Sequence, residues 1–78
     1  MIKFYSLAED AAQRLENFLK QNDCRYMITD DDANTKQLAI NDFHNMAMLT
    51  FNDSVRFISE TAKTIEIDNS EFAHLKTM

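Results

Sequence analysis

The pattern of apolar and polar positions is clearest between Ser6 and Asn22, where it predicts an amphipathic helix. Apolar residues recur at the i, i+4, i+8, i+11 and i+12 positions that share one helix face. They are Leu7, Ala11, Leu15, Phe18 and Leu19. Ser6 and Glu9 have the spacing of a capping box, and Asn22 can take the left-handed conformation that ends a helix. Polar residues fill the opposite face, which we expect to be exposed: Asp10, Gln13, Arg14, Glu16, Asn17 and Lys20.

Short β-prone segments flank this helix. Ile2 to Tyr5 alternates apolar and polar residues, and Cys24 to Thr29 is rich in strand-forming residues. A strand, a helix and a strand with tight connections form a βαβ unit, whose two strands run parallel with a right-handed crossover.

The next segment has two interpretations. Asp31 or Asp32 can cap a second helix over Ala33 to Asp42, because acids are favourable at a helix N-terminus. Alternatively, Leu38 and Ile40 alternate with polar neighbours, which indicates a strand over Lys36 to Asn41. The strand version gives a ferredoxin-like βαββαβ arrangement, with its middle helix over Asn52 to Ala62.

A hairpin is expected in the second half of the chain. Met46 to Phe51 and Ser54 to Ile58 are its two arms, and Asn52-Asp53 is a two-residue turn that needs positive φ at both positions. The chain contains no glycine, so asparagine and aspartate are the residues best suited to such turns.

The last segment is expected to hold a short edge strand and a short helix. Thr64 to Asp68 alternates apolar and polar residues, after a polar loop over Ser59 to Lys63. Asp68 and Glu71 have capping-box spacing before a terminal helix over Ser70 to Lys76.

Length and composition indicate one small cytoplasmic domain. The 78 residues are enough for a single modest core, and 45% hydrophobic residues are ordinary for a globular protein. No apolar run approaches the roughly 20 residues of a membrane-spanning helix, and the N-terminus does not resemble a signal peptide. One cysteine cannot form an internal disulfide, which fits a reducing compartment.

Charge and missing glycine exclude several functions. Thirteen acidic against eight basic residues give a net charge of −5, which disfavours direct nucleic-acid binding. Without glycine, the chain has no phosphate-binding loop of the P-loop or dinucleotide type, so we expect no cofactor.

The order of these segments resembles that of the glutaredoxins, small members of the thioredoxin fold. Lys3-Phe-Tyr-Ser6 is similar to the first strand of that family, and Arg25 to Asp31 is similar to the second. Leu38 to Asp53 keeps the family's spacing from its second helix to its hairpin turn, so the resemblance covers residues 2 to 58. It implies a small mixed sheet of four or five strands flanked by helices.

The residues that give glutaredoxins their activity are absent. Ala8-Glu9-Asp10-Ala11 stands where the family has Cys-x-x-Cys, Ala47 replaces its cis-proline, and Ser59-Glu60 falls at its Gly-Gly pair. Disulfide exchange needs a thiolate that a helix N-terminus stabilises. The resemblance therefore implies a redox-inactive relative and not an enzyme.

Individual reactive residues lack partners at useful spacing. Cys24 has only Arg25 as a cationic neighbour in sequence, so we interpret it as a structural cysteine, with a residual monothiol redoxin as an alternative function. His44 and His74 have no Cys or His at ligand spacing, which predicts no metal site. Consecutive acids at Asp30 to Asp32 point in different directions, which suits a turn better than a calcium site.

The acidic surface is the remaining candidate for function. We predict that another protein with a basic surface binds it, and the candidate contact residues are Glu9, Asp10, Asp30, Asp31 and Asp32. Small acidic chains without chemistry of their own resemble the accessory proteins that phages encode. The expected function is thus a non-enzymatic protein-interaction module that modulates or inhibits a host protein. An acidic mimic of nucleic acid, which would block a DNA- or RNA-binding protein, is the alternative.

Overall fold

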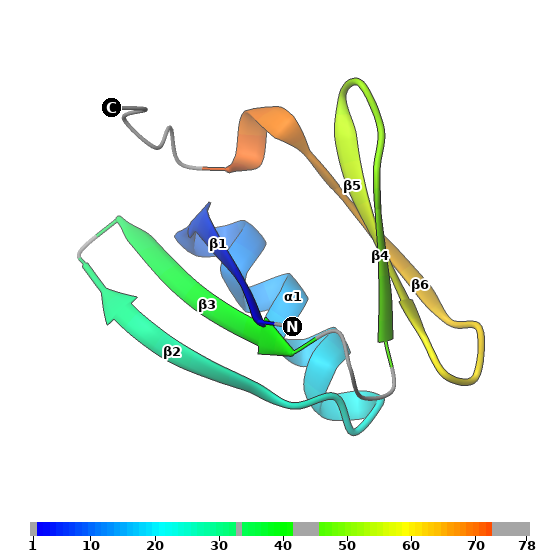
Figure 1. Ribbon diagram of the computed structural model, residues 1–78. Helices are drawn as coiled ribbons and strands as arrows, with labels where there is room; N and C mark the ends of the chain where they lie inside the picture. The colour runs from blue at the N-terminus through cyan, green and yellow to red at the C-terminus, as the bar shows by residue number, and fades with distance from the viewer. Residues whose placement is uncertain (1, 33, 42–45, 73–78) are drawn as a thin grey trace.

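One helix and two three-stranded antiparallel sheets make up the described part of the chain (Figure 1). The computed structural model describes residues 2–32, 34–41 and 46–72. In chain order the elements are β1 (Ile2–Ala8), α1 (Glu9–Gln21), β2 (Tyr26–Asp31), β3 (Thr35–Asn41), β4 (Met46–Thr50), β5 (Ser54–Ser59), β6 (Thr64–Asp68) and the 3-10 turn η1 (Asn69–Glu71). The predicted small α/β class is confirmed, with two antiparallel sheets in place of one mixed sheet.

The first sheet, sheet A, has the strand order β1-β3-β2. β3 pairs antiparallel with both neighbours, so β1 and β2 run in the same direction on either side of it. The predicted strand–helix–strand unit therefore has its two strands parallel, but a third strand is inserted between them. This arrangement is a split βαβ unit.

The predicted helix over Ala33 to Asp42 is wrong, because residues 35–41 form strand β3. The alternating pattern decides the outcome: Leu38 and Ile40 are both fully buried on one face of the sheet. Consequently Asp31 and Asp32 do not cap a helix.

The strand interpretation of Lys36 to Asn41 is correct. Its accompanying ferredoxin-like helix over Asn52 to Ala62 is wrong, because β5 occupies Ser54–Ser59.

The second sheet, sheet B, is the meander β4-β5-β6. The predicted hairpin and the edge strand Thr64–Asp68 are confirmed. The hairpin turn closes through a hydrogen bond of 2.8 Å from the Phe51 N–H to the Ser54 carbonyl. Positive φ at Asn52 and Asp53 was wrongly expected, since among the described residues only Asp23 and Ala62 have positive φ.

Helix α1 begins later than its sequence pattern suggested. Ser6 lies in β1 and accepts a hydrogen bond of 3.2 Å from Gln37 Nε2, so it does not cap the helix. Pairing with β3 extends β1 as far as Ala8, and Glu9 then starts the helix directly. At the other end Asn22 has φ −112°, and the left-handed conformation falls one residue later, at Asp23.

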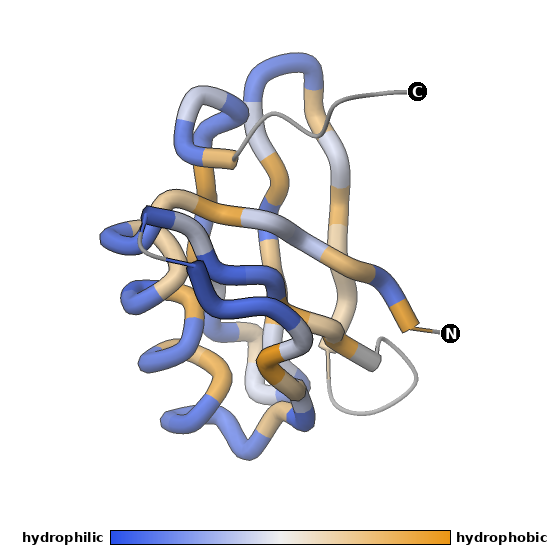
Figure 2. Tube along the Cα trace, turned by 90° about the vertical axis from the view of Figure 1, so that its left-hand side faces the viewer, coloured by the Kyte–Doolittle hydropathy of each residue, from blue (hydrophilic) through white to orange (hydrophobic). Residues whose placement is uncertain are grey.

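The core lies where α1 meets the inner faces of both sheets. The helix contacts β1 and β3 of sheet A and β6 of sheet B, and Figure 2 shows hydrophobic and hydrophilic residues alternating around it. All five predicted stripe residues are buried. The large apolar side chains that are fully buried come from β1, α1, β3, β5 and β6: Leu7, Leu15, Leu19, Leu38, Ile40, Phe57 and Ile67.

The segment after β6 closes the structure against the first half of the chain. Phe72 forms an isolated antiparallel bridge with Leu7, and Arg14 of α1 forms an ion pair with Glu71. The predicted capping box is confirmed, with the Asp68 N–H donating to Glu71 Oε1 at 3.1 Å. The helix that it begins is only the 3-10 turn η1 as far as Glu71, and residues 73–76 of the predicted helix lie outside the described residues.

Replacing Phe57 by alanine should destabilise the protein strongly. Phe57 is fully buried and packs edge-to-face on Tyr5 at a centroid distance of 5.3 Å. Truncating a buried phenylalanine typically costs about 3–5 kcal/mol. Urea unfolding measures the change, with Phe4→Ala as the matched control because Phe4 is 56% exposed. Equal losses in the two variants would contradict the assignment of the core.

Candidate functional site

The structure brings the five predicted acidic residues to one end of sheet A. β1 ends at Ala8, which pairs with Thr35 at the start of β3, and Glu9 follows at once as the first residue of α1. The Glu9 N–H donates to the Asn34 carbonyl at 3.2 Å, so the start of the helix lies against the β2–β3 turn. In that turn the Asp32 N–H donates to the Thr35 carbonyl at 2.8 Å. Two segments more than twenty positions apart in sequence are thereby joined.

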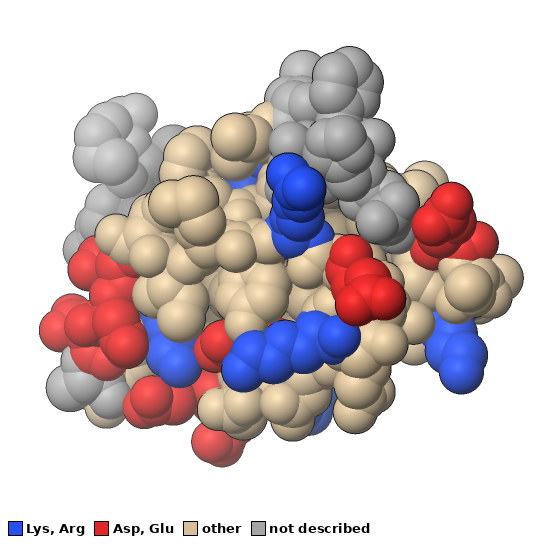
Figure 3. All heavy atoms as spheres, turned by 90° about the horizontal axis from the view of Figure 1, so that it is seen from below, with Lys and Arg blue, Asp and Glu red and all other residues tan. Residues whose placement is uncertain are grey.

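All five of these residues are exposed, and we call them the acidic end: Glu9, Asp10, Asp30, Asp31 and Asp32. In Figure 3 acidic side chains gather on the left, the side on which β2 ends in Figure 1, with basic side chains among and beside them. Glu9 and Asp10 also lie in the first turn of α1, where the helix dipole stabilises negative charge. The fold thus concentrates charge that the sequence only spreads along the chain.

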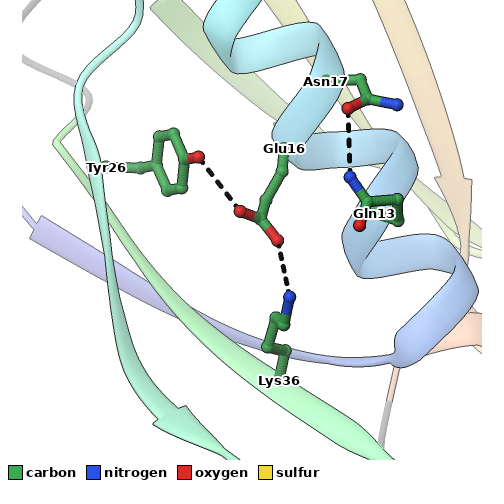
Figure 4. A network of polar contacts seen from close by, with 5 residues as sticks. All are labelled: Gln13, Glu16, Asn17, Tyr26 and Lys36. Atoms are coloured by element: carbon green, nitrogen blue, oxygen red, sulfur yellow. Dashed lines mark hydrogen bonds and ion pairs between the residues drawn. The ribbon is translucent and has the colours of Figure 1, made fainter.

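Beneath the acidic end lies a buried carboxylate that the sequence pattern placed on the exposed helix face. Glu16 is 5% exposed, and both its oxygens are bonded (Figure 4). Oε1 accepts a hydrogen bond of 3.0 Å from the Tyr26 hydroxyl, and Oε2 lies 3.0 Å from Lys36 Nζ. The sequence offers one sign of this burial. Ala12 is an apolar residue one helical turn before Glu16, on the same side of the helix, and it is fully buried.

The Glu16 carboxylate contributes to raising the pKa of both of its partners. The pKa of Lys36 is raised above its ordinary value, first by its bond to Glu16 and then by attraction to Glu16, Asp31 and Glu9, against an opposing effect of burial. The pKa of Tyr26 is raised by burial and by donation to the same carboxylate. The largest of these effects on Lys36 is its hydrogen bond to Glu16.

Cys24 is in a setting unsuited to thiolate chemistry. The side chain is buried, and Sγ donates to the Asn22 carbonyl at 3.6 Å. Burial and the neighbouring Asp23 raise the pKa of the thiol. Reactive cysteines need the opposite shift, from a cation or a helix N-terminus.

Within the ranges 2–32, 34–41 and 46–72, no group of three or more His, Cys, Asp or Glu side chains is arranged to hold a metal ion. This statement includes the consecutive acids at Asp30 to Asp32. His44 and His74 lie outside those ranges.

Comparison with known proteins returns no relative. No family model, curated protein or solved structure matches the chain. The helix in the described part of the chain is too short and too polar to cross a membrane.

The raised pKa values of Tyr26 and Lys36 predict a loss of stability in alkaline solution. A group whose pKa is higher in the folded chain contributes fully below its unfolded pKa, and this contribution is lost as the pH rises through the folded pKa. The loss therefore begins above pH 10.0 for Tyr26 and above pH 10.5 for Lys36.

Glu16→Gln removes a charge that contributes to both raised pKa values, so the variant's free energy of unfolding should fall less between about pH 8 and about pH 11 than that of the wild type. Urea unfolding at both pH values measures this slope. Cys24 is present in both proteins and does not affect the comparison. Glu60→Gln is the control, since Glu60 is exposed and should leave the slope unchanged. Identical slopes in all three proteins would refute the role given to Glu16.

Proposed function

We propose that this protein is a non-enzymatic interaction module whose acidic end binds a basic surface of another protein. The observation that carries the proposal is the gathering of Glu9, Asp10, Asp30, Asp31 and Asp32, all exposed, where α1 begins and the β2–β3 hairpin turns. Its partner is a cytoplasmic protein that it modulates or inhibits, in the manner of phage accessory proteins.

The charge around the acidic end supports this function. Lys36 lies beside Asp31 in the register of β2 and β3, and its ammonium group is bonded to the buried Glu16. The exposed carboxylates of these residues outnumber this cation, so the surface is locally negative. Complementary charge of this kind accelerates association and orients the partner.

An acidic mimic of nucleic acid is the second candidate. The same gathering of carboxylates favours it, because a protein groove that binds phosphates would also accept a contiguous row of acids. The identity of the partner distinguishes the two candidates: a nuclease, a polymerase or a nucleoid protein indicates a mimic.

A residual monothiol redoxin is the weakest candidate. Burial of Cys24 and the raised pKa of its thiol both count against it. The resemblance to glutaredoxins remains a prediction, and the interaction proposal does not depend on it.

Affinity capture from cytosolic extract, at low and high salt, tests the proposed function. A stoichiometric partner released by salt is the expected result, because salt screens contacts between exposed charges. Capture that is indifferent to salt would exclude an electrostatic contact, and no partner at either salt concentration would count against both binding functions.

Neutralising two acids of this surface should weaken binding to the captured partner. Each exposed ion pair contributes about 0.2–1 kcal/mol, so Asp10→Asn with Asp30→Asn should raise Kd roughly two- to thirty-fold and reduce its salt dependence. Asp53→Asn with Glu60→Gln is the matched control, since it removes the same charge from exposed residues in the turns on either side of β5. Titration calorimetry measures both variants, and equal weakening would mean that net charge acts without a defined site.

A further inference from the structure

The outer face of sheet A is not covered by any element of residues 2–32, 34–41 and 46–72. The inner face carries Leu7, Leu38 and Ile40, which are fully buried against α1 and sheet B. Side chains alternate along a strand, so the residues between them point to the opposite side. No described element packs on that side, which is open to solvent.

Half of this open face is apolar. Phe4, Ala39 and Met27 lie in one row across β1, β3 and β2, and Ile2 lies beside Phe4 on the same face of β1. Phe4 and Ile2 are each 56% exposed and Met27 is 67% exposed. An antiparallel sheet with one solvated face normally turns polar residues outward, so three large exposed apolar side chains here indicate a contact surface.

The apolar half is also hollowed. Ala39, the small residue of the central strand, lies between larger side chains of the two edge strands. The groove has a volume of about 370 Å³, and the described residues that line it are Ile2, Cys24, Arg25, Tyr26, Met27 and Ala39. Its size and apolar walls suit one or two large apolar side chains of a partner.

The other half of the face leads to the acidic end. The next row is polar, with Gln37 donating to Ser6 Oγ at 3.2 Å and Thr29 donating to Gln37 Oε1 at 2.9 Å. Asp30 pairs with Gln37 in register, and Asp32 bonds to Thr35 beyond it. Two residues along a strand span roughly 7 Å, so the acids begin about 7–14 Å from the apolar row. Figure 2 shows this change in hydropathy along the β2–β3 hairpin.

We propose that the outer face of sheet A is the docking surface and that its occupant is a segment of another protein with basic residues at one end and apolar residues at the other. The proposal rests on the proposed function and extends it from the acidic end to the whole face. Arg25 lines the groove at the end opposite the acids. A segment with basic residues at one end therefore binds more favourably with that end at the acids than with that end at Arg25. Charge complementarity thereby specifies both the chemistry and the orientation of the occupant.

A second copy of this chain fits the face poorly. Turned to face it, a copy would offer Asp30 and Asp32 of its own beside the same apolar row, so acid would meet acid unless the copy were reversed. Two chains of net charge −5 also repel each other.

Three synthetic peptides test the proposal with the protein alone. The first has a run of lysines followed by alternating leucine and serine; the second replaces its leucines with serine; the third replaces its lysines with glutamate. The first should bind at least about tenfold more tightly than either of the others, because a few buried apolar anchors dominate such contacts. Its binding should also shift the backbone amide NMR signals of Ile2, Phe4, Met27 and Ala39, a readout that needs no variant.

A pair of matched variants locates the contact. Phe4→Ser with Met27→Ser should abolish the preference for leucine and leave binding of the leucine-free peptide unchanged. Leu49→Ser with Phe51→Ser is the control, because these residues are 45% and 41% exposed on sheet B. Urea unfolding of each variant confirms that it is folded.

The outcomes separate this inference from the proposed function. Equal binding of the first two peptides would mean that charge alone acts, which overturns the docking face and leaves the acidic end intact. Tightest binding of the glutamate peptide would overturn both. A wild-type dimer that Phe4→Ser with Met27→Ser converts to monomer in sedimentation would show that a second copy covers the face, and would overturn the proposed occupant.

Discussion

The structure depends on one helix that serves two sheets. Each sheet has three short strands and one apolar face, and such a sheet is stable only when that face is covered. α1 meets this need for both, since Leu15 and Leu19 are fully buried in the same cluster as Leu38 of sheet A and Ile67 of sheet B. Among the described residues, no second helix covers the outer face of sheet A. The position of the helix therefore determines which surfaces are available for function.

Glu16 links the helix to the β2–β3 hairpin by polar contacts within this apolar region. Burying a carboxylate is costly unless it is paired and hydrogen-bonded, and here Tyr26 and Lys36 supply both oxygens with donors. Among the described residues, no buried side-chain nitrogen or oxygen lacks a hydrogen-bond partner. Tyr26 lies at the start of β2, and Lys36 lies near the start of β3, so the carboxylate holds the hairpin at both ends. The position of the acidic end relative to α1 follows from this contact.

The sequence correctly predicted those helices and strands whose formation depends on residues close together in the chain. The helix stripe, the β4–β5 hairpin and the strand Thr64–Asp68 all follow from periodicity within a few residues. The errors have a common cause in contacts distant along the chain. Ser6 has the sequence signal of a helix cap, but pairing with β3 extends strand β1 past it. Glu16 has the pattern of an exposed residue, but Tyr26 and Lys36, which come later in the chain, bond to it and bury it. Residues 35–41 carried helix and strand signals at once, and pairing with β1 and β2 decided between them.

The candidate site could be predicted only as a list of residues, because its geometry depends on the same distant contacts. Glu9 and Asp10 approach Asp30 to Asp32 through the pairing of Ala8 with Thr35, which no local signal encodes. The apolar outer face escaped sequence analysis for a related reason. Ile2, Phe4 and Met27 fit a strand equally well facing inward or outward, and a register shift of one residue would exchange the two faces. The buried positions Leu7, Leu38 and Ile40 fix that register, so the same residues that form the core also determine that an apolar row lies exposed beside the acids.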